Sequence, residues 1–472
     1  MGIIETRDNP YLEGIYAPID HEVVLDDLVV EGEIPKDLNG VFVRNGPNPR
    51  YTPPGRHHWF DGDAMLHSMS FCQGQVCYRN RWVRAPHFEM EAEAGKPLWG
   101  GLMEPFSANP KVSLFKDTAN TDVIAHNGEL KAMWYLSGDL VTVDPITLET
   151  QGVDSFGGDL MGKVSAHAKV DPRSGELLFF GFGMKPPFMF YGEADATGKL
   201  QYQVPVPLPG PRLPHDMAFT ENYAILMDLP VFYNMEALKK GRWKSEFHRD
   251  MPSRFALVPR KGRPGEIRWF ESTPCYIYHV INAWEEGNEV VMVGCKVDQP
   301  INAPRDEDGM YAQMMANLRV RARLQRWRFN LETGAVSEEP IDDRNTEFPS
   351  INLGFLGRPS KYSYNVMLAD APTLLFDGLV KYNIETSESS SYAFEKGWYG
   401  SESPFAPRDG ATAEDDGYVV SFMRGGPDDK SELHVFDAQS VEKGPLARIT
   451  IPMDVPLGFH ATWVPANECR KV

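Results

Sequence analysis

The sequence contains few cysteines, and none of them belongs to a recognisable motif. Five occur in 472 residues: Cys72, Cys77, Cys275, Cys295 and Cys469. No CxxC pair is present, and an odd number with wide gaps argues against a disulfide framework. Cys72 and Cys77 flank a short turn, which leaves a disulfide open there, although we do not expect one. The cysteines therefore favour a reducing compartment, and we expect a cytoplasmic protein.

Long apolar runs and an excess of basic charge are also missing. No run of about 18 apolar residues occurs, and the first residues lack the apolar segment of a signal peptide. We therefore expect neither a transmembrane helix nor a signal peptide. The chain has 47 basic and 66 acidic residues, which gives a formal net charge of −19. Because phosphate binding needs a basic surface, nucleic acid is excluded as a partner.

Motifs of several common enzyme classes are absent. The sequence contains no GxSxG, P-loop, GxGxxG or HExxH pattern, which are typical of serine hydrolases, nucleotide-binding proteins and zinc proteases. Turn-forming residues are abundant, with 41 glycines and 38 prolines spread along the chain. This distribution favours many short strands joined by turns. We expect one closed array of repeats, a single domain over residues 1–472.

An internal repeat supports this interpretation. A strand with alternating apolar residues, followed by Asp or Asn and a Thr, Ser or Gly turn, recurs at residues 140–149, 168–177, 326–336, 379–389 and 433–443. This pattern is typical of an antiparallel hairpin, because Asp and Asn side chains stabilise turns. The last three copies lie roughly 50 residues apart, the size of one propeller blade. The sequence therefore predicts an all-β propeller.

Other segments depart from the strand pattern. Residues 310–327 contain no Gly or Pro and are rich in helix formers, so we expect a helix with its methionines in the core. The segments 96–110, 183–193 and 229–241 are apolar and irregular. Such loops either form lids and entrances or cover the ends of sheets. We expect 183–193 and 229–236 to form an entrance for a lipophilic substrate.

Four histidines have distinctive positions. His167, His215 and His279 each begin a run with apolar alternation, a turn and a returning apolar strand, and His460 lies in GFHATWVP. In a propeller, the start of the innermost strand of a blade faces the central axis, so these imidazoles are expected to converge. Converging imidazoles suit Zn, Cu, Fe or Ni. The alternative is that each histidine is a hydrogen-bonded structural residue.

Two glutamates are candidate partners of these histidines. Glu347 lies in NTEFPSIN and Glu402 in GSESPFAPR, each before an aromatic residue and a proline. Metal-bound histidines donate their outer ring N–H to such acceptors. Taken alone, either glutamate would be interpreted as a solvated surface acid.

Several motifs in collinear order resemble the carotenoid cleavage oxygenase family. They are FVRNGPNPRY (42–51), HWFDGDAMLH (58–67), TEFPSIN (346–352), the segment 402–422 and GFHATW (458–463), together with the four histidines. The resemblance implies a seven-bladed β-propeller with a helical and loop cap over one face. It implies a non-haem Fe(II) held by His167, His215, His279 and His460, with Glu347 and Glu402 fixing imidazole tautomers. It also implies cleavage of a conjugated C=C bond by O2 into two carbonyl products.

The sequence departs from the family pattern in a strand about 33 residues before the first histidine, His167. The family usually carries a further glutamate where LKAMWYLSGDL (130–140) places Tyr135. A tyrosine hydroxyl accepts a hydrogen bond without carrying charge, so either one histidine is held less firmly or another group serves. Stilbene-cleaving relatives tend to carry a lysine at the position of Trp134. We expect Trp134, and Trp59 of the HWFDGDAMLH motif, to contact an apolar polyene; packing within a blade is the alternative for Trp134.

These observations predict a carotenoid- or apocarotenoid-cleaving dioxygenase. The partners are O2 and a small lipophilic alkene, with no obligate protein partner and with peripheral membrane contact as an option. One alternative keeps the chemistry and changes the substrate to a stilbene or phenylpropenoid. Another keeps the iron and performs isomerisation or ester cleavage. A third is a propeller that only binds a ligand, which would have no use for four such histidines.

Overall fold

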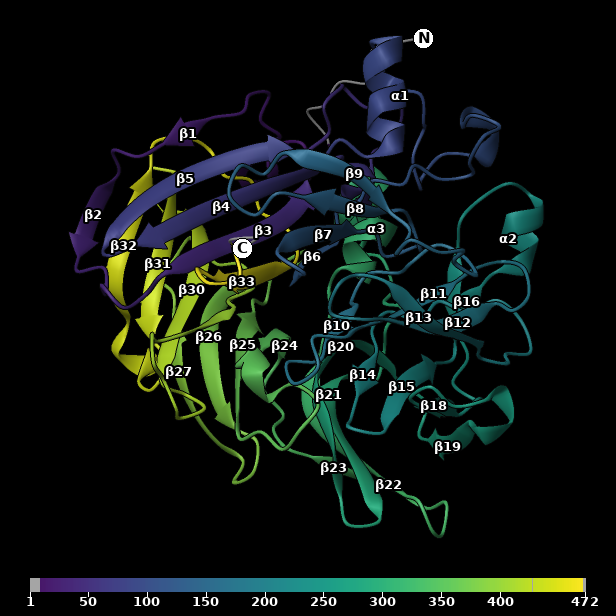
Figure 1. Cartoon of the computed structure of the whole chain (residues 1–472). Helices are drawn as coiled ribbons and strands as arrows, with labels where there is room; N and C mark the ends of the chain where they lie inside the picture. Colours follow the sequence, from purple (N-terminus) through teal and green to yellow (C-terminus); the bar gives the residue numbers. More distant parts are fainter. Residues whose placement is uncertain (1–8, 427, 470–472) are drawn as a thin grey trace.

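The computed structural model describes residues 9–426 and 428–469, and strands form most of it (Figure 1). The first sheet combines both ends of the chain: β1 (Val24–Leu25), β5 (Gln75–Trp82), β4 (Ala64–Cys72), β3 (Gly40–Pro47) and β33 (Ala461–Pro465). The last sheet comprises β2 (Val29–Gly32), β32 (Pro445–Ile451), β31 (Lys430–Asp437), β30 (Gly417–Gly425) and β28 (Trp398–Tyr399), with β29 (Phe405–Pro407) also paired to β30.

Between them lie sheets of four antiparallel strands each, formed by consecutive parts of the chain. They are β6 (Asp122–His126), β7 (Glu129–Met133), β8 (Leu140–Val143) and β9 (Thr150–Asp154); β10 (Lys169–Val170), β11 (Leu177–Phe182), β12 (Met189–Ala194) and β13 (Leu200–Pro205); β14 (Ala218–Phe219), β15 (Tyr223–Asp228), β18 (Ser253–Pro259) and β19 (Arg268–Ser272); β20 (Tyr276–Glu286), β21 (Glu289–Val297), β22 (Arg323–Asn330) and β23 (Val336–Pro340); and β24 (Thr346–Ser350), β25 (Tyr362–Leu368), β26 (Phe376–Asn383) and β27 (Glu388–Ala393). A hairpin of β16 (Val231–Tyr233) and β17 (Ser245–Phe247) stands apart.

The described residues thus form a propeller of seven blades, which confirms the predicted fold class. The ring closes where β33 pairs with β3 and β32 pairs with β2, so residues from both ends of the chain complete the first and last blades. The innermost strands of neighbouring blades contact one another, as β33 with β6 and β20 with β24. These strands therefore surround the central axis.

The composition of each strand follows its place in a blade. β21 lies in the middle of its sheet, is rich in valine and is almost entirely buried. Such strands are covered by neighbouring blades on both faces, where β-branched side chains pack well. The outer strand β27 carries serine and glutamate and is largely exposed. Polar side chains on an outer edge discourage pairing with other chains.

The expected helix over 310–327 is wrong over most of its length. The structure has a 3-10 turn, η6 (Asp306–Tyr311), and a short helix, α3 (Ala312–Asn317), before β22 begins at Arg323. Side chains of β22 alternate in burial, with Trp327 and Phe329 in the core. This two-residue period, completed by pairing with β21, overrides local helix propensity. Met314 is buried as expected, whereas Met310 is 61% exposed.

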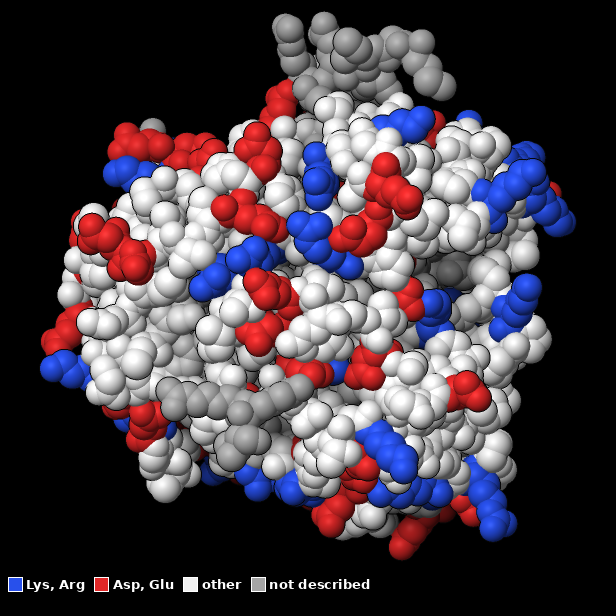
Figure 2. Space-filling model, turned by 45° about the horizontal axis from the view of Figure 1, so that its top comes forward, with Lys and Arg blue, Asp and Glu red and all other residues white. Residues whose placement is uncertain are grey.

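The other helices and the surface complete the description. α1 (Pro86–Ala94) and α2 (Met235–Lys239) lie outside the blades at the top and right of Figure 1. None of the helices among the described residues has the length and apolar character to cross a membrane. Cys72 and Cys77 form no disulfide. Acidic and basic side chains are interspersed on the face seen in Figure 2.

Candidate metal centre

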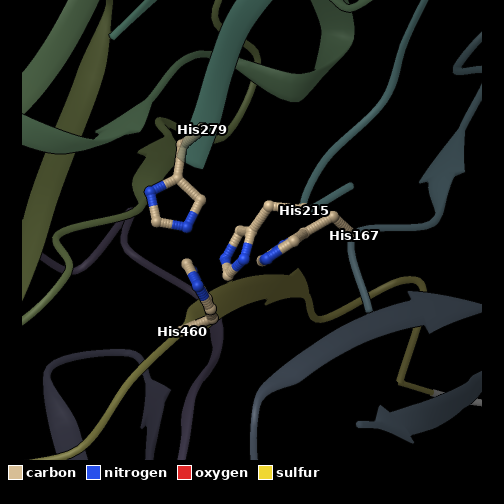
Figure 3. A group of neighbouring side chains, drawn as sticks. All are labelled: His167, His215, His279 and His460. Atoms are coloured by element: carbon tan, nitrogen blue, oxygen red, sulfur yellow. The ribbon is translucent and has the colours of Figure 1, made fainter. Parts of the chain in front are cut away.

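The four histidines converge on the propeller axis. His279 lies in β20, while His460, His167 and His215 lie one, two and three residues before the innermost strands β33, β10 and β14, respectively. All are buried, and one ring nitrogen from each lies within 4.8 Å of the others. Figure 3 shows the rings arriving from different blades and pointing toward a common centre. The repeated position at the start of an inner strand therefore brings together side chains that lie far apart in the sequence.

Glu347 and Glu402 face two of these rings from the neighbouring blades. The Nδ1 atom of His279 lies 2.5 Å from Oε2 of Glu347, and Nδ1 of His460 lies 3.2 Å from Oε1 of Glu402. Each carboxylate also accepts a backbone N–H, Glu347 from Phe348 and Glu402 from Ala461. Both glutamates are buried, so the reading as solvated surface acids is wrong.

A third carboxylate, which the sequence analysis missed, faces His167. Oδ2 of Asp122 lies 3.1 Å from both the ring Nδ1 and the backbone nitrogen of His167. Asp122 is the first residue of the inner strand β6. Glu347 and Glu402 likewise lie near the start of a strand, β24 and β29, in their own blades. That position in the repeat was the available signal.

His215 differs from the other three histidines. Its Nδ1 atom is buried without a hydrogen-bond partner. The ring of Tyr135 packs against it at 4.7 Å between centroids, and that of Tyr278 meets it edge-on at 5.2 Å. Tyr135 therefore contacts His215 through its ring rather than as an acceptor.

The environment keeps most of the imidazoles neutral. Burial, followed by the neighbouring histidines, holds the pKa of His167 and of His279 well below the ordinary value, and burial lowers that of His215 to about 3. Burial also disfavours charge on His460, but the Glu402 carboxylate outweighs this effect and raises its pKa. Burial raises the pKa of Glu347 well above its usual range.

The ring nitrogens fit a metal ion. The Nε2 atoms of His167 and His279 are buried and lack a hydrogen-bond partner. Because Nδ1 of each ring donates to a carboxylate, Nε2 carries a lone pair. Buried acceptors without a donor are unfavourable unless another group, such as a metal, occupies the centre. A neutral imidazole is also the form that binds metals.

A cavity of about 530 Å³ opens beside the histidines. Its wall includes His215, His279 and His460, and most of the remainder is apolar, with Phe60, Leu102, Met314, Phe348, Leu374 and Phe459. This volume lies within the range of small-molecule sites. Residues of α2 and α3 line the same cavity, so the short helices and loops cover this side of the site.

The two tryptophans that were predicted to contact substrate lie in different environments in the structure. Trp134 is buried in the cavity wall. Trp59 is absent from that wall and stacks on Tyr11 at 5.1 Å between ring centroids, so the expected substrate contact of Trp59 is wrong. Its neighbour Phe60 lines the cavity instead, because the 3-10 turn η3 (Trp59–Asp61) turns adjacent side chains to different sides.

The three apolar segments noted in the sequence differ in whether they line the cavity. Residues 229–241 contribute Val231 and Ala237 to the cavity wall, and residues 96–110 contribute Leu102, Met103 and Glu104. The segment 183–193 contributes none, and its second half belongs to strand β12. The expectation that 183–193 forms an entrance is therefore wrong.

A seven-bladed propeller whose axis holds four histidines beside an apolar cavity defines the class of this protein. The family model described as retinal pigment epithelial membrane protein matches residues 16–465. The chain belongs to this family, the carotenoid cleavage oxygenases.

Individual relatives support this family assignment. The chain is 33% identical to carotenoid 9,10(9',10')-cleavage dioxygenase of Crocus sativus, over 98% of this chain and 90% of the relative. It is 31% identical to isoeugenol monooxygenase of Pseudomonas nitroreducens, over 97% and 98%. The crystal structure of Pseudomonas brassicacearum lignostilbene dioxygenase superposes with a TM-score of 0.88 at 30% identity, over 97% and 98%. The predicted enzyme class, an oxidoreductase that uses O2, is thereby confirmed.

Proposed function

We propose that this protein is a non-haem Fe(II) dioxygenase that cleaves a conjugated C=C bond of a lipophilic alkene with O2, giving two carbonyl products. The observation that carries the proposal is the buried cluster of four histidines in the wall of an apolar cavity. His167, His215, His279 and His460 would hold the metal. Bound iron would supply the activation of O2, which no side chain of the cavity provides.

The donor set is compatible with iron. Four imidazole nitrogens suit iron, copper, nickel or zinc, whereas calcium and magnesium prefer oxygen ligands. Zinc has no redox chemistry, so it does not serve an oxygenase. Iron is also the metal that the carotenoid cleavage oxygenase motifs imply.

The chain itself positions the reactants and excludes water. The Phe348 ring stacks on His460 at 4.8 Å between centroids, and Phe459 packs with Trp59 behind the wall. Rigid apolar groups beside the histidines would hold a flat conjugated chain near the centre. Glu347 and Glu402 would fix the ring tautomers of His279 and His460. Positioning in a dry cavity is the contribution expected of the protein.

For the substrate, we propose a carotenoid or apocarotenoid. The apolar wall and the indole of Trp134 support this choice, because an indole face packs well on a conjugated chain. A second candidate is a stilbene or phenylpropenoid alkene. It is favoured by Tyr135 and Tyr278, whose side chains line the wall beside His215 and offer hydroxyl groups. It is also favoured by the relatives named for isoeugenol and lignostilbene.

We further propose peripheral membrane contact near the cavity mouth. The exposed cations Arg242 and Lys244 line the cavity, and Phe115 packs against Trp243 between them. Leu114, beside Phe115, is 55% exposed. An apolar side chain next to cations suits the surface of a membrane from which a lipophilic substrate is taken.

The direct test is product analysis. Iron-loaded protein is incubated in air with apocarotenoids, stilbenes and phenylpropenoids, and carbonyl products are identified by mass spectrometry. Two carbonyl fragments from a polyene support the leading proposal, and fragments from an aromatic alkene alone support the second. An isomer or a hydrolysed ester, or no product from any alkene tested, would contradict both.

A further inference from the structure

Three of the four histidines share one arrangement. In each, a carboxylate accepts a hydrogen bond from the ring Nδ1–H of the histidine. The same carboxylate also accepts a backbone N–H, which belongs to the histidine itself or to the residue that follows the histidine or the carboxylate. Glu347 serves His279, Glu402 serves His460, and Asp122 serves His167. Among the described residues, His215 has no such partner, and aromatic rings contact it instead.

We propose that Asp122 is a positioning residue that holds His167 in the geometry required for metal binding. The inference rests on the proposed function, since it assigns the third carboxylate of the same site. Tyr135, at the position where the family usually carries a glutamate, contacts His215 through its ring. Asp122, at the start of the inner strand β6 of the same blade, serves His167.

The backbone of His167 supports this role. His167 has a φ of +69°, in the left-handed region that residues with a side chain rarely adopt. Such a conformation persists only where the surroundings determine it. A single oxygen of Asp122 accepts both the backbone N–H and the ring Nδ1–H of His167, so it fixes the main chain and the ring together.

Asp122 is itself held rigidly. Its second carboxylate oxygen accepts the backbone N–H of Val123 at 2.7 Å, and its carbonyl accepts a hydrogen bond from the Asn45 side chain at 3.0 Å. Asp122 is buried, with 7% of its surface exposed, so bulk water has little access to these contacts. Removing the carboxylate would leave two donors of His167 without a partner and release the ring.

The experiment is a Co²⁺ titration of metal-free protein, followed by visible absorption. Asp122→Ala should weaken Co²⁺ binding by about 10–100-fold and change the cobalt spectrum, as loss of such outer acceptors does. Asp122→Asn, which retains one acceptor oxygen, should weaken it less. Tyr135→Phe should bind Co²⁺ within about twofold of the wild type, because only the Tyr135 ring meets His215.

Asp117→Asn is the matched control. Asp117 is also buried and accepts backbone N–H groups, from Ala119 and Asp139, but contacts none of the four histidines. It should bind Co²⁺ like the wild type. Thermal unfolding of the metal-free variants separates loss of the fold from loss of the site.

Two results overturn the role of Asp122. One is Co²⁺ binding by folded Asp122→Ala with the affinity and spectrum of the wild type. The other is a Tyr135→Phe variant that loses as much affinity as Asp122→Ala. A wild-type protein that binds neither Co²⁺ nor Fe²⁺ would contradict the proposed metal site itself, which is a separate outcome.

Discussion

The Nδ1 atom of His279 lies 2.5 Å from Oε2 of Glu347, across the boundary between two neighbouring blades. The contact joins residues 68 positions apart in the sequence and depends on the packing of β20 against β24. It makes the orientation of one imidazole a property of the packing between blades. Three of the four histidines are oriented in this way, and the fourth by aromatic rings.

Replacing Glu347 or Glu402 with alanine should weaken metal binding or activity by about 10–100-fold, because each carboxylate orients a histidine ring. Glutamine at either position should cost less, since its amide oxygen still accepts a hydrogen bond. Metal titration of the purified variants measures the effect. Glu395, an exposed residue paired with Arg448, provides the control, and Glu395→Ala should behave like the wild type. Alanine variants of both buried glutamates with wild-type metal binding and turnover would show that they have no such role.

Trp134 should matter for the Michaelis constant of a polyene. Trp134→Ala removes an indole from the cavity wall, so the KM for an apocarotenoid should rise while the iron content stays unchanged. Turnover of wild-type protein should be detectable with an apocarotenoid and weak with a 4-hydroxystilbene, because an indole offers a phenol no charged partner. Steady-state kinetics with both substrates provide the check. Efficient cleavage of the hydroxystilbene with none of the polyenes tested would favour the aromatic alkene instead.

Trp59 should act on stability rather than on substrate binding. Its ring is 3% exposed and packs among Tyr11, Tyr16 and Phe459. Trp59→Ala should lower the free energy of unfolding by about 3–5 kcal/mol, the usual cost of such a cavity in a core. Denaturant unfolding of metal-free protein measures it. A variant of unchanged stability and raised KM would restore Trp59 to the substrate site.

The sequence predicts the blades and the histidines because both repeat. Each histidine stands at or near the start of an inner strand, so a pattern along the chain is also a pattern around the axis. The role of Asp122 depends on His167, 45 residues later and in the next blade, and only the place of Asp122 at the start of an inner strand signals that contact. The helix expected over 310–327 failed for a similar reason, because pairing with β21 decides the structure from Arg323 onward.

The sequence also could not predict which side chains point toward the cavity. Trp59 and Phe60 are adjacent in the same motif, and only the 3-10 turn decides that Phe60 lines the cavity. The segment 183–193 is as apolar as 229–241, yet half of it is a buried strand of a blade. Composition identifies apolar segments, but whether they cover a cavity depends on their tertiary contacts.

The most direct test of the four-histidine metal site is the iron content of the protein and of a variant lacking one ligand. Wild-type protein loaded with Fe(II) under anaerobic conditions and desalted should contain about one iron per chain by elemental analysis. His279→Ala, treated in the same way and shown to be folded by circular dichroism, should lose most of the iron and the activity. Full iron content and activity in His279→Ala, or a folded wild-type protein that retains no iron, would contradict the site.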